Sequence, residues 1–203
     1  SKMIISRSYS TYDNDLYLYD MHSKEIKLIT THDNYREPAE FFASSFDASG
    51  ENLYFNTNNK SDLFRTGVYN LMSGNISYPE YDFLKNYRNR EVARTVFSSD
   101  KSKMLVQIND RGYDRLFMYD LAAGKEINIP KELETLSITA ISFSNKESKV
   151  IIGVNSAANP SVLYQWDYSS GLVEQLTQPD LGGIDPGTFV EPELFSYRSF
   201  DDL

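Results

Sequence analysis

The sequence predicts an all-β protein: a β-propeller fragment of about four blades, each a four-stranded antiparallel sheet. An aromatic residue at a strand end, followed by Asp or Asn, recurs at Tyr19, Tyr69, Tyr119 and Trp166, with spacings of 50, 50 and 47 residues. A turn residue lies five positions after each of these aromatics. The chain also contains 15 Tyr and 12 Phe, which favour strands because flat side chains suit a half-buried pleated surface.

Each recurring aromatic ends the third strand of a unit, and a hairpin connects it to a short fourth strand. The turn residues are Lys24, Gly74, Gly124 and Gly171, and glycine supplies the positive φ that a tight hairpin requires. The fourth strands are expected at residues 25–29, 75–77, 126–129 and 172–176.

Earlier strands complete each unit. One begins 16 or 17 residues before each aromatic, at Lys2, Asn52, Lys103 and Lys149. Three of these have a leading strand before them, over residues 40–47, 93–99 and 138–144. The blades therefore cover approximately residues 1–31, 39–80, 91–131 and 137–178, and the first is incomplete because it lacks its leading strand. We expect a piece of a larger ring, whose exposed blade edges allow self-association.

Two other repeat-rich folds fit the sequence less well. A helical repeat requires apolar residues at i, i+3, i+4 and i+7, whereas these segments alternate or form short apolar runs between turns. An immunoglobulin-like sandwich also has many short strands, but it lacks a recurring offset between aromatic, Asp and Gly.

Composition excludes several classes of function. The net charge of −9 and the pI near 4.7 oppose binding to nucleic-acid phosphates. No apolar stretch is long enough to cross a membrane as a helix. Cysteine is absent, which removes disulfides, zinc–thiolate sites and cysteine nucleophiles, and fits a reducing compartment. We therefore expect a cytoplasmic protein without nucleic-acid or membrane partners.

No catalytic, cofactor or metal site is expected in this chain. An α/β-hydrolase needs a G-x-S-x-G motif followed by Asp and His, and the motif is absent. Both histidines, His22 and His32, precede every plausible nucleophile. The acidic groups Asp13–Asp15 and Asp110 with Asp114 lack the twelve-residue calcium-loop pattern, so turn capping is the favoured interpretation.

Two connections between blades are candidate interdomain or substrate-facing loops. Residues 32–37, which include His32 and Arg36, join the first blade to the second. Residues 85–90, which include Arg88 and Arg90, are the most basic stretch and could pair with carboxylates of a neighbouring domain. Solvated loops are the simpler interpretation of both stretches.

The repeat stops at Pro179. Residues 179–188 are dense in Gly, Pro and Asp and indicate a loop. An extended segment follows it. We expect residues 179–203 to be a linker and the first strand leading toward an α/β-hydrolase domain that this chain does not contain.

Sequence motifs in the tail and the blades suggest a family. The tail contains Glu191–Leu194 followed by Tyr197–Asp201, and the blades contain Phe46–Leu53 and Phe97–Asp100. These segments resemble the prolyl oligopeptidase family of serine peptidases, in its acylaminoacyl-peptidase-like branch. The tail is similar to the family's passage from propeller to hydrolase domain, although Asp202 stands where Gly is usual.

The resemblance implies a two-domain peptidase. Its propeller would cover the active site of the hydrolase domain, which carries a Ser-Asp-His triad, and would restrict entry to short peptides. The partners implied are that hydrolase domain, in the same polypeptide, and the peptides themselves.

Two alternatives stay open at this point. A free-standing TolB-like or WD40-like propeller would act as a protein-binding platform. A propeller that is itself an enzyme would need inward-facing acids on several blades, whereas the inner strands near Ala43, Val96 and Ala140 carry mostly small or apolar residues.

Overall fold

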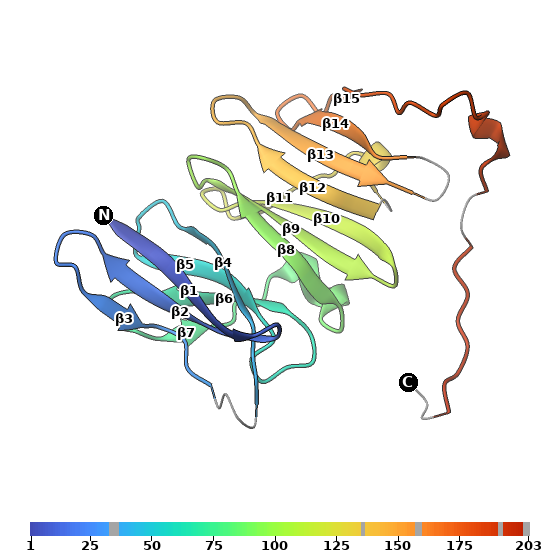
Figure 1. Cartoon of the computed structure of the whole chain (residues 1–203). Helices are drawn as coiled ribbons and strands as arrows, with labels where there is room; N and C mark the ends of the chain where they lie inside the picture. The colour runs from blue at the N-terminus through green and yellow to red at the C-terminus, as the bar shows by residue number, and fades with distance from the viewer. Residues whose placement is uncertain (33–36, 135–136, 157–159, 191–192, 201–203) are drawn as a thin grey trace.

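The computed structural model describes residues 1–32, 37–134, 137–156, 160–190 and 193–200. Within them, fifteen strands form four antiparallel sheets that follow one another in chain order (Figure 1). The first sheet contains β1 (Lys2–Ser10), β2 (Asp13–Asp20) and β3 (Ile26–Leu28). The second contains β4 (Phe41–Phe46), β5 (Asn52–Thr57), β6 (Arg65–Asn70) and β7 (Ile76–Ser77). The third contains β8 (Glu91–Phe97), β9 (Lys103–Asp110), β10 (Tyr113–Asp120) and β11 (Lys125–Ile127). The fourth contains β12 (Ser137–Phe143), β13 (Lys149–Asn155), β14 (Val162–Asp167) and β15 (Val173–Gln175).

The predicted propeller blades are confirmed. Strands pair in chain order within every sheet, and the first sheet has three strands, as the sequence predicts. In the described part of the tail there is a short 3-10 turn, η3 (Pro186–Thr188), and no strand. The tail runs away from the fourth sheet in Figure 1.

The hydrophobic core lies between neighbouring sheets. The second strands β5 and β9 are buried along most of their length, because each has a neighbouring blade on both sides. On β5, Leu53 and Phe55 pack in a cluster with Leu16 of the first sheet, and Tyr54 lies against Phe97 of the third, with ring centroids 4.9 Å apart. Alternation of side chains across a strand gives β5 these two contact faces.

The only tryptophan packs at the last junction between blades. Trp166 on β14 is 1% exposed and belongs to a cluster that includes Leu105, Leu116 and Met118 of the third sheet. Trp166 is therefore a packing residue of this junction.

The recurring Asp or Asn closes the hairpin between third and fourth strands. Oδ1 of Asp20 accepts hydrogen bonds from the backbone N–H of His22 at 2.8 Å and Ser23 at 3.3 Å, and Oδ1 of Asp120 accepts from Ala122 and Ala123. These backbone donors lower the pKa of both carboxyls. The turn residues have the expected positive φ, 63° at Lys24, 73° at Gly74, 65° at Gly124 and 78° at Gly171. The predicted hairpins are confirmed.

A second recurring position joins each blade to the next. The amide of Asn14 on β2 accepts from the Phe41 N–H at 2.7 Å and donates to the Phe41 carbonyl at 2.9 Å. Fifty residues later, the Phe64 carbonyl accepts from the N–H of Val92 at 3.0 Å. Fifty residues further on, Asp114 Oδ2 accepts from the N–H of Ile138 at 2.6 Å. Each bond satisfies a backbone donor at the start of the next inner strand.

These bonds correct the expected turn-capping roles of the acidic groups. Asp13, Asn14 and Asp15 are buried in β2 and face the connection to the second sheet. In the β9–β10 hairpin, the backbone N–H of Gly112 donates to Oδ1 of Asn109, and neither Asp110 nor Asp114 accepts this bond. The physical reason is that a strand end beside another blade meets unpaired backbone donors of that blade.

Strand alternation sorts the connections onto two ends of the sheets. Because neighbouring strands are antiparallel, the hairpin turns at residues 21–25, 71–75, 121–124 and 168–172 lie at one end, which we call the turn end. The opposite end, which we call the linker end, carries the long connections 29–40, 58–64, 78–90 and 128–136. The tail leaves β15 from the linker end as well.

The Asn14 bridge yields a stability prediction. Asn14→Ala removes both hydrogen bonds to Phe41 and leaves the buried backbone N–H and carbonyl of Phe41 without these partners. The free energy of unfolding should therefore fall by about 2 kcal/mol. Asp114→Ala, at the matching position, removes one bond and should cost less. Urea denaturation measures both changes. A loss below about 0.5 kcal/mol for Asn14→Ala would contradict this role of the bridge.

A pH dependence follows from the β8–β9 hairpin. Asp100 accepts from the Ser98 hydroxyl at 2.6 Å and the Ser102 N–H at 3.0 Å, and these bonds lower its pKa from 3.8 to about 2. Because the pKa of Asp100 is lower in the folded state than in the unfolded state, the ionised carboxylate stabilises the fold at any pH above the unfolded-state pKa. This stabilisation is lost as the pH falls from about 4 to about 2. The acid-induced loss should shrink in Asp100→Asn, measured by urea denaturation at each pH. Asp180→Asn, a control in the tail, should lose as much stability between pH 4 and pH 2 as the wild type does.

Candidate functional site

The described residues that the sequence singles out all lie at the linker end, but at two different junctions between sheets. His32 lies in the connection from β3 to β4, and Arg88 and Arg90 lie in the connection from β7 to β8. Arg36, the fourth predicted residue, lies outside the described residues. Two separate arrangements occur at this end: a buried histidine cluster at the first junction and a pocket at the second.

His32 is buried between two carboxylates. Its Nε2 lies 2.5 Å from Asp13 Oδ1 and its Nδ1 lies 3.4 Å from Asp15 Oδ1, and its side chain is 1% exposed. His32 Nε2 and Asp13 Oδ1 are therefore hydrogen-bonded. The expectation of a solvated loop is therefore wrong at His32.

Backbone pairing holds the histidine in place. The N–H of Ile29 donates to the Leu16 carbonyl at 3.0 Å, and the Thr30 hydroxyl accepts from the Leu16 N–H at 2.8 Å. The same hydroxyl donates to Asp15 Oδ1 at 2.9 Å. The connection thus runs along β2 before it reaches the second sheet, and this path places His32 over the two carboxylates. Sequence spacing alone gives no signal for the contact, because 19 residues separate His32 from Asp13.

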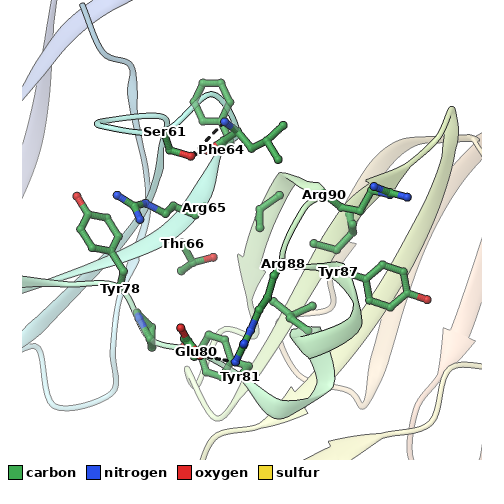
Figure 2. Close-up of a pocket in the computed structure, with 15 residues that line it drawn as sticks. Ser61, Phe64, Arg65, Thr66, Tyr78, Glu80, Tyr81, Tyr87, Arg88 and Arg90 are labelled. Atoms are coloured by element: carbon green, nitrogen blue, oxygen red, sulfur yellow. Dashed lines mark hydrogen bonds and ion pairs between the residues drawn. The ribbon is translucent and has the colours of Figure 1, made fainter. Parts of the chain in front are cut away.

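A pocket of about 280 Å³ opens at the linker end between the second and third sheets (Figure 2). The 58–64 connection lies on one side of it, and the other side is the 78–90 connection, which contains the 3-10 helix η1 (Asp82–Tyr87). The lining includes the polar and charged residues Ser61, Arg65, Thr66, Glu80, Arg88 and Arg90. The rest of the lining is apolar or aromatic: Leu63, Phe64, Tyr78, Pro79, Tyr81, Leu84, Tyr87, Val92 and Ile108.

Two of the three pocket arginines are neutralised by carboxylates of this chain. Arg88 pairs with Glu80 at 2.5 Å on the exposed rim, as Figure 2 shows. Arg90 pairs with Asp110 at 2.8 Å, and Asp110 also accepts from Arg115 at 2.7 Å. These hydrogen bonds lower the pKa of Asp110, and the bond from Arg90 has the largest effect. Asp110 is therefore an ion-pair residue and not a turn cap.

Arg65 differs from the other two pocket arginines. Its guanidinium stacks over the Tyr78 ring, 3.8 Å from the centroid, and the two side chains lie together in Figure 2. Nη2 donates to the Asn59 carbonyl at 3.0 Å. The buried Nε has no acceptor among the described residues, and none of their ion pairs includes Arg65. Arg65 lies in an ordinary position of β6 that carries no sequence motif, so no local pattern marks it as a pocket residue.

The inner strands provide little catalytic chemistry. Among their residues, β4, β8 and β12 carry one acid, Glu91. The buried polar side chains beside these strands are uncharged and bind one another: the Thr95 hydroxyl donates to Asn56 Oδ1 at 3.0 Å. In the described part of the chain, no three His, Asp or Glu side chains are placed to hold a metal ion. The same residues include no helix long and apolar enough to cross a membrane.

The histidine cluster makes a stability prediction with an internal control. His32→Gln removes the ring that lies between Asp13 and Asp15 and leaves the buried Asp13 carboxylate without its His32 partner, so unfolding should become easier by about 3–5 kcal/mol. His22→Gln, on an exposed hairpin turn, should change stability by less than about 0.5 kcal/mol. Thermal or urea denaturation checks the pair, and equal effects would overturn the assignment.

Known structures share this fold. Prolyl oligopeptidase B from Galerina marginata, as apo protein, matches with a TM-score of 0.76 and 13% sequence identity, over 100% of this chain and 28% of its own. A structure from a study of two prolyl endopeptidases matches with a TM-score of 0.68 and 11% identity, over 91% of this chain and 26% of its own. TolB from Acinetobacter baumannii matches with a TM-score of 0.62 and 15% identity, over 89% of this chain and 41% of its own.

Sequence comparisons give the family. This chain spans about a quarter of the length of the prolyl oligopeptidases that it matches in structure. No curated protein matches it by sequence. The family model for the prolyl oligopeptidase N-terminal β-propeller domain matches residues 1–179. Together with the four blades, this match shows that the chain belongs to the prolyl oligopeptidase N-terminal β-propeller family.

Proposed function

We propose that this chain is the substrate-gating domain of a serine peptidase that acts on short peptides. The propeller would lie against an α/β-hydrolase domain of the same polypeptide and limit the size of peptides that reach its active site. Membership of the prolyl oligopeptidase propeller family supports this proposal, because that family's propeller accompanies a peptidase domain.

The linker end is the face proposed to meet the hydrolase domain. The single observation that carries this assignment is that the tail leaves β15 at the end where the long connections gather. The tail also exposes large apolar side chains, with Phe195 76% and Tyr197 81% exposed, which suits burial against another domain.

The finer assignment is to the acylaminoacyl-peptidase-like branch. The tail motif supports it, with Glu193–Leu194 followed by Tyr197–Phe200 in the described residues. A cytoplasmic location is part of the same proposal, supported by a chain that contains no cysteine.

A second candidate is a free-standing propeller that binds proteins. The structural match to TolB favours it, because TolB covers 89% of this chain with the same blade architecture. The two candidates predict different reading frames. A reading frame that ends near Leu203 favours the protein-binding propeller, and one that continues into a hydrolase domain favours the substrate-gating domain.

The test begins with that reading frame. Beyond Leu203 we expect a G-x-S-x-G motif followed by Asp and His within one hydrolase domain. Its absence would contradict the peptidase proposal.

The complete protein then tests the gate itself. It should hydrolyse short peptides in a serine-reagent-sensitive manner, and kcat/KM should fall steeply as the same cleavage site is placed in longer peptides and in an unfolded protein. A serine-to-alanine variant of the nucleophile is the control for contaminating activity. Equal kcat/KM at every length would contradict gating while leaving the peptidase assignment intact.

A further inference from the structure

We infer that the side of β1 that faces away from β2, which we call the β1 edge, is a docking site for an extended peptide segment. The segment adds to the first sheet as a fourth strand, with a phenylalanine opposite Met3 and an acidic residue opposite Arg7. The inference does not depend on the proposed peptidase function, because it uses only the strand registers and side chains of this chain. It rests on the single partner strand of β1, on the strands that hold this position in the other three sheets, and on the charge of β1.

The β1 edge has no partner strand among the described residues. β1 pairs with β2 alone, whereas the matching strands β5, β9 and β13 each pair on both sides. The Ser1 carbonyl accepts a hydrogen bond from the Met21 N–H at 2.9 Å, so the odd-numbered residues of β1 direct their backbone groups toward β2. The backbone groups of Lys2, Ile4 and Ser6 therefore point to the β1 edge. Such a row of unpaired donors and acceptors is a template for one more strand.

The other three sheets show which kind of strand fits the β1 edge. β4, β8 and β12 are six or seven residues long, pair antiparallel with the second strand of their sheet, and contain one bulge each. The pair Lys2–Asp20 aligns β1 with these sheets, where it recurs as Asn52–Asn70, Lys103–Asp120 and Lys149–Asp167. The residues opposite the Met3 position are all phenylalanines: Phe46, Phe97 and Phe143. The residues opposite the Arg7 position, five places earlier in each strand, are all buried: Phe41, Val92 and Ile138.

Side-chain exposure shows that the β1 edge is accessible. Arg7 is exposed, whereas its counterparts in the other sheets are buried: Thr57, Ile108 and Val154. Ala43 on β4 is also exposed, whereas its counterpart Thr95 on β8 is 3% exposed. β8 contacts β4 of the preceding sheet, and a strand at the β1 edge would contact β4 in the same way. The docking site therefore continues from β1 onto β4.

The charge of β1 favours an acidic segment. β1 contains Lys2 and Arg7 and no acidic residue. Arg7 forms no ion pair with the described residues, and its guanidinium lies over the Tyr9 ring, 5.2 Å from the centroid. Asp15 lies opposite Arg7 on β2. Its oxygens accept hydrogen bonds from the hydroxyls of Thr30 at 2.9 Å and Tyr9 at 3.3 Å instead.

A carboxylate on the incoming strand complements Arg7. Side chains directly opposite one another in an antiparallel pair are about 5 Å apart at Cβ, so Asp or Glu at this place reaches the guanidinium. An exposed ion pair changes affinity by only about threefold. The backbone hydrogen bonds therefore hold the segment, and the ion pair selects its sequence and register. β1 of a second copy offers no acidic residue, so the segment differs in sequence from β1.

The experiment titrates the isotope-labelled chain with a peptide and follows the amide signals by NMR. The peptide has the sequence of residues 137–145 with glutamate in place of Ile138: N-acetyl-Ser-Glu-Thr-Ala-Ile-Ser-Phe-Ser-Asn-amide. In the register of β12, its glutamate lies opposite Arg7 and its phenylalanine opposite Met3. We expect signal shifts in β1 and β4, with slower hydrogen exchange at the even-numbered amides of β1.

Two control peptides test the sequence requirement. The same peptide with lysine in place of glutamate should bind at least about threefold more weakly, because it places a cation opposite Arg7. A scrambled peptide of the original composition should leave the β1 signals unchanged. Equal binding of the scrambled peptide, shifts confined to other strands, or no binding of the glutamate peptide would overturn the inference. Shifts in β1 that grow with protein concentration in the absence of peptide would assign the edge to a second copy and overturn it as well.

Charge reversal tests the role of Arg7. Arg7→Glu should reverse the preference, so that the lysine peptide binds more tightly than the glutamate peptide. Arg111→Glu is the matched control, because it makes the same change of charge on the exposed turn between β9 and β10. It should keep the wild-type preference for glutamate. A folded Arg7→Glu protein that still prefers the glutamate peptide contradicts the assignment.

Discussion

The packing of one blade face against the next is the constraint on which the rest of the structure depends. The second strands β5 and β9 bury side chains on both faces, so each is stable only between two neighbouring sheets. Dehydration of these faces also removes water from the starts of the inner strands. Their backbone donors then need partners from the previous blade, and Asn14, Phe64 and Asp114 supply them. The apolar packing between blades therefore makes the polar contacts between them necessary.

The same constraint explains where functional chemistry can occur. Between the second and third sheets, the polar groups of Asn56 and Thr95 satisfy one another. A pocket forms where the repeat is broken by a long loop and an aromatic residue at the bridging position, as at Phe64. Long connections lie at the linker end by strand topology, so variable chemistry is concentrated there.

Local features of the fold could be predicted from the sequence, and contacts across blades could not. The hairpins at Asp20 and Asp120 depend on residues within five positions, so their pattern is visible in the repeat. His32 and Asp13 meet only because the connection runs back along β2, which no local pattern encodes. Arg88 and Arg90 were recognised as a basic stretch, whereas Arg65 in an ordinary strand position was missed. Its distinction is the absence of a carboxylate partner, which is a property of the folded junction.

Hydrogen–deuterium exchange tests most directly the proposed contact between the linker end and a catalytic domain. The exchange of this chain alone is compared with that of the same residues in the complete protein. The account predicts slower exchange in the complete protein at the linker-end connections 58–64 and 78–90 and in the tail, with no change in the turns at 71–75 and 121–124. Slower exchange confined to the turn end, or no difference at either end, would contradict it.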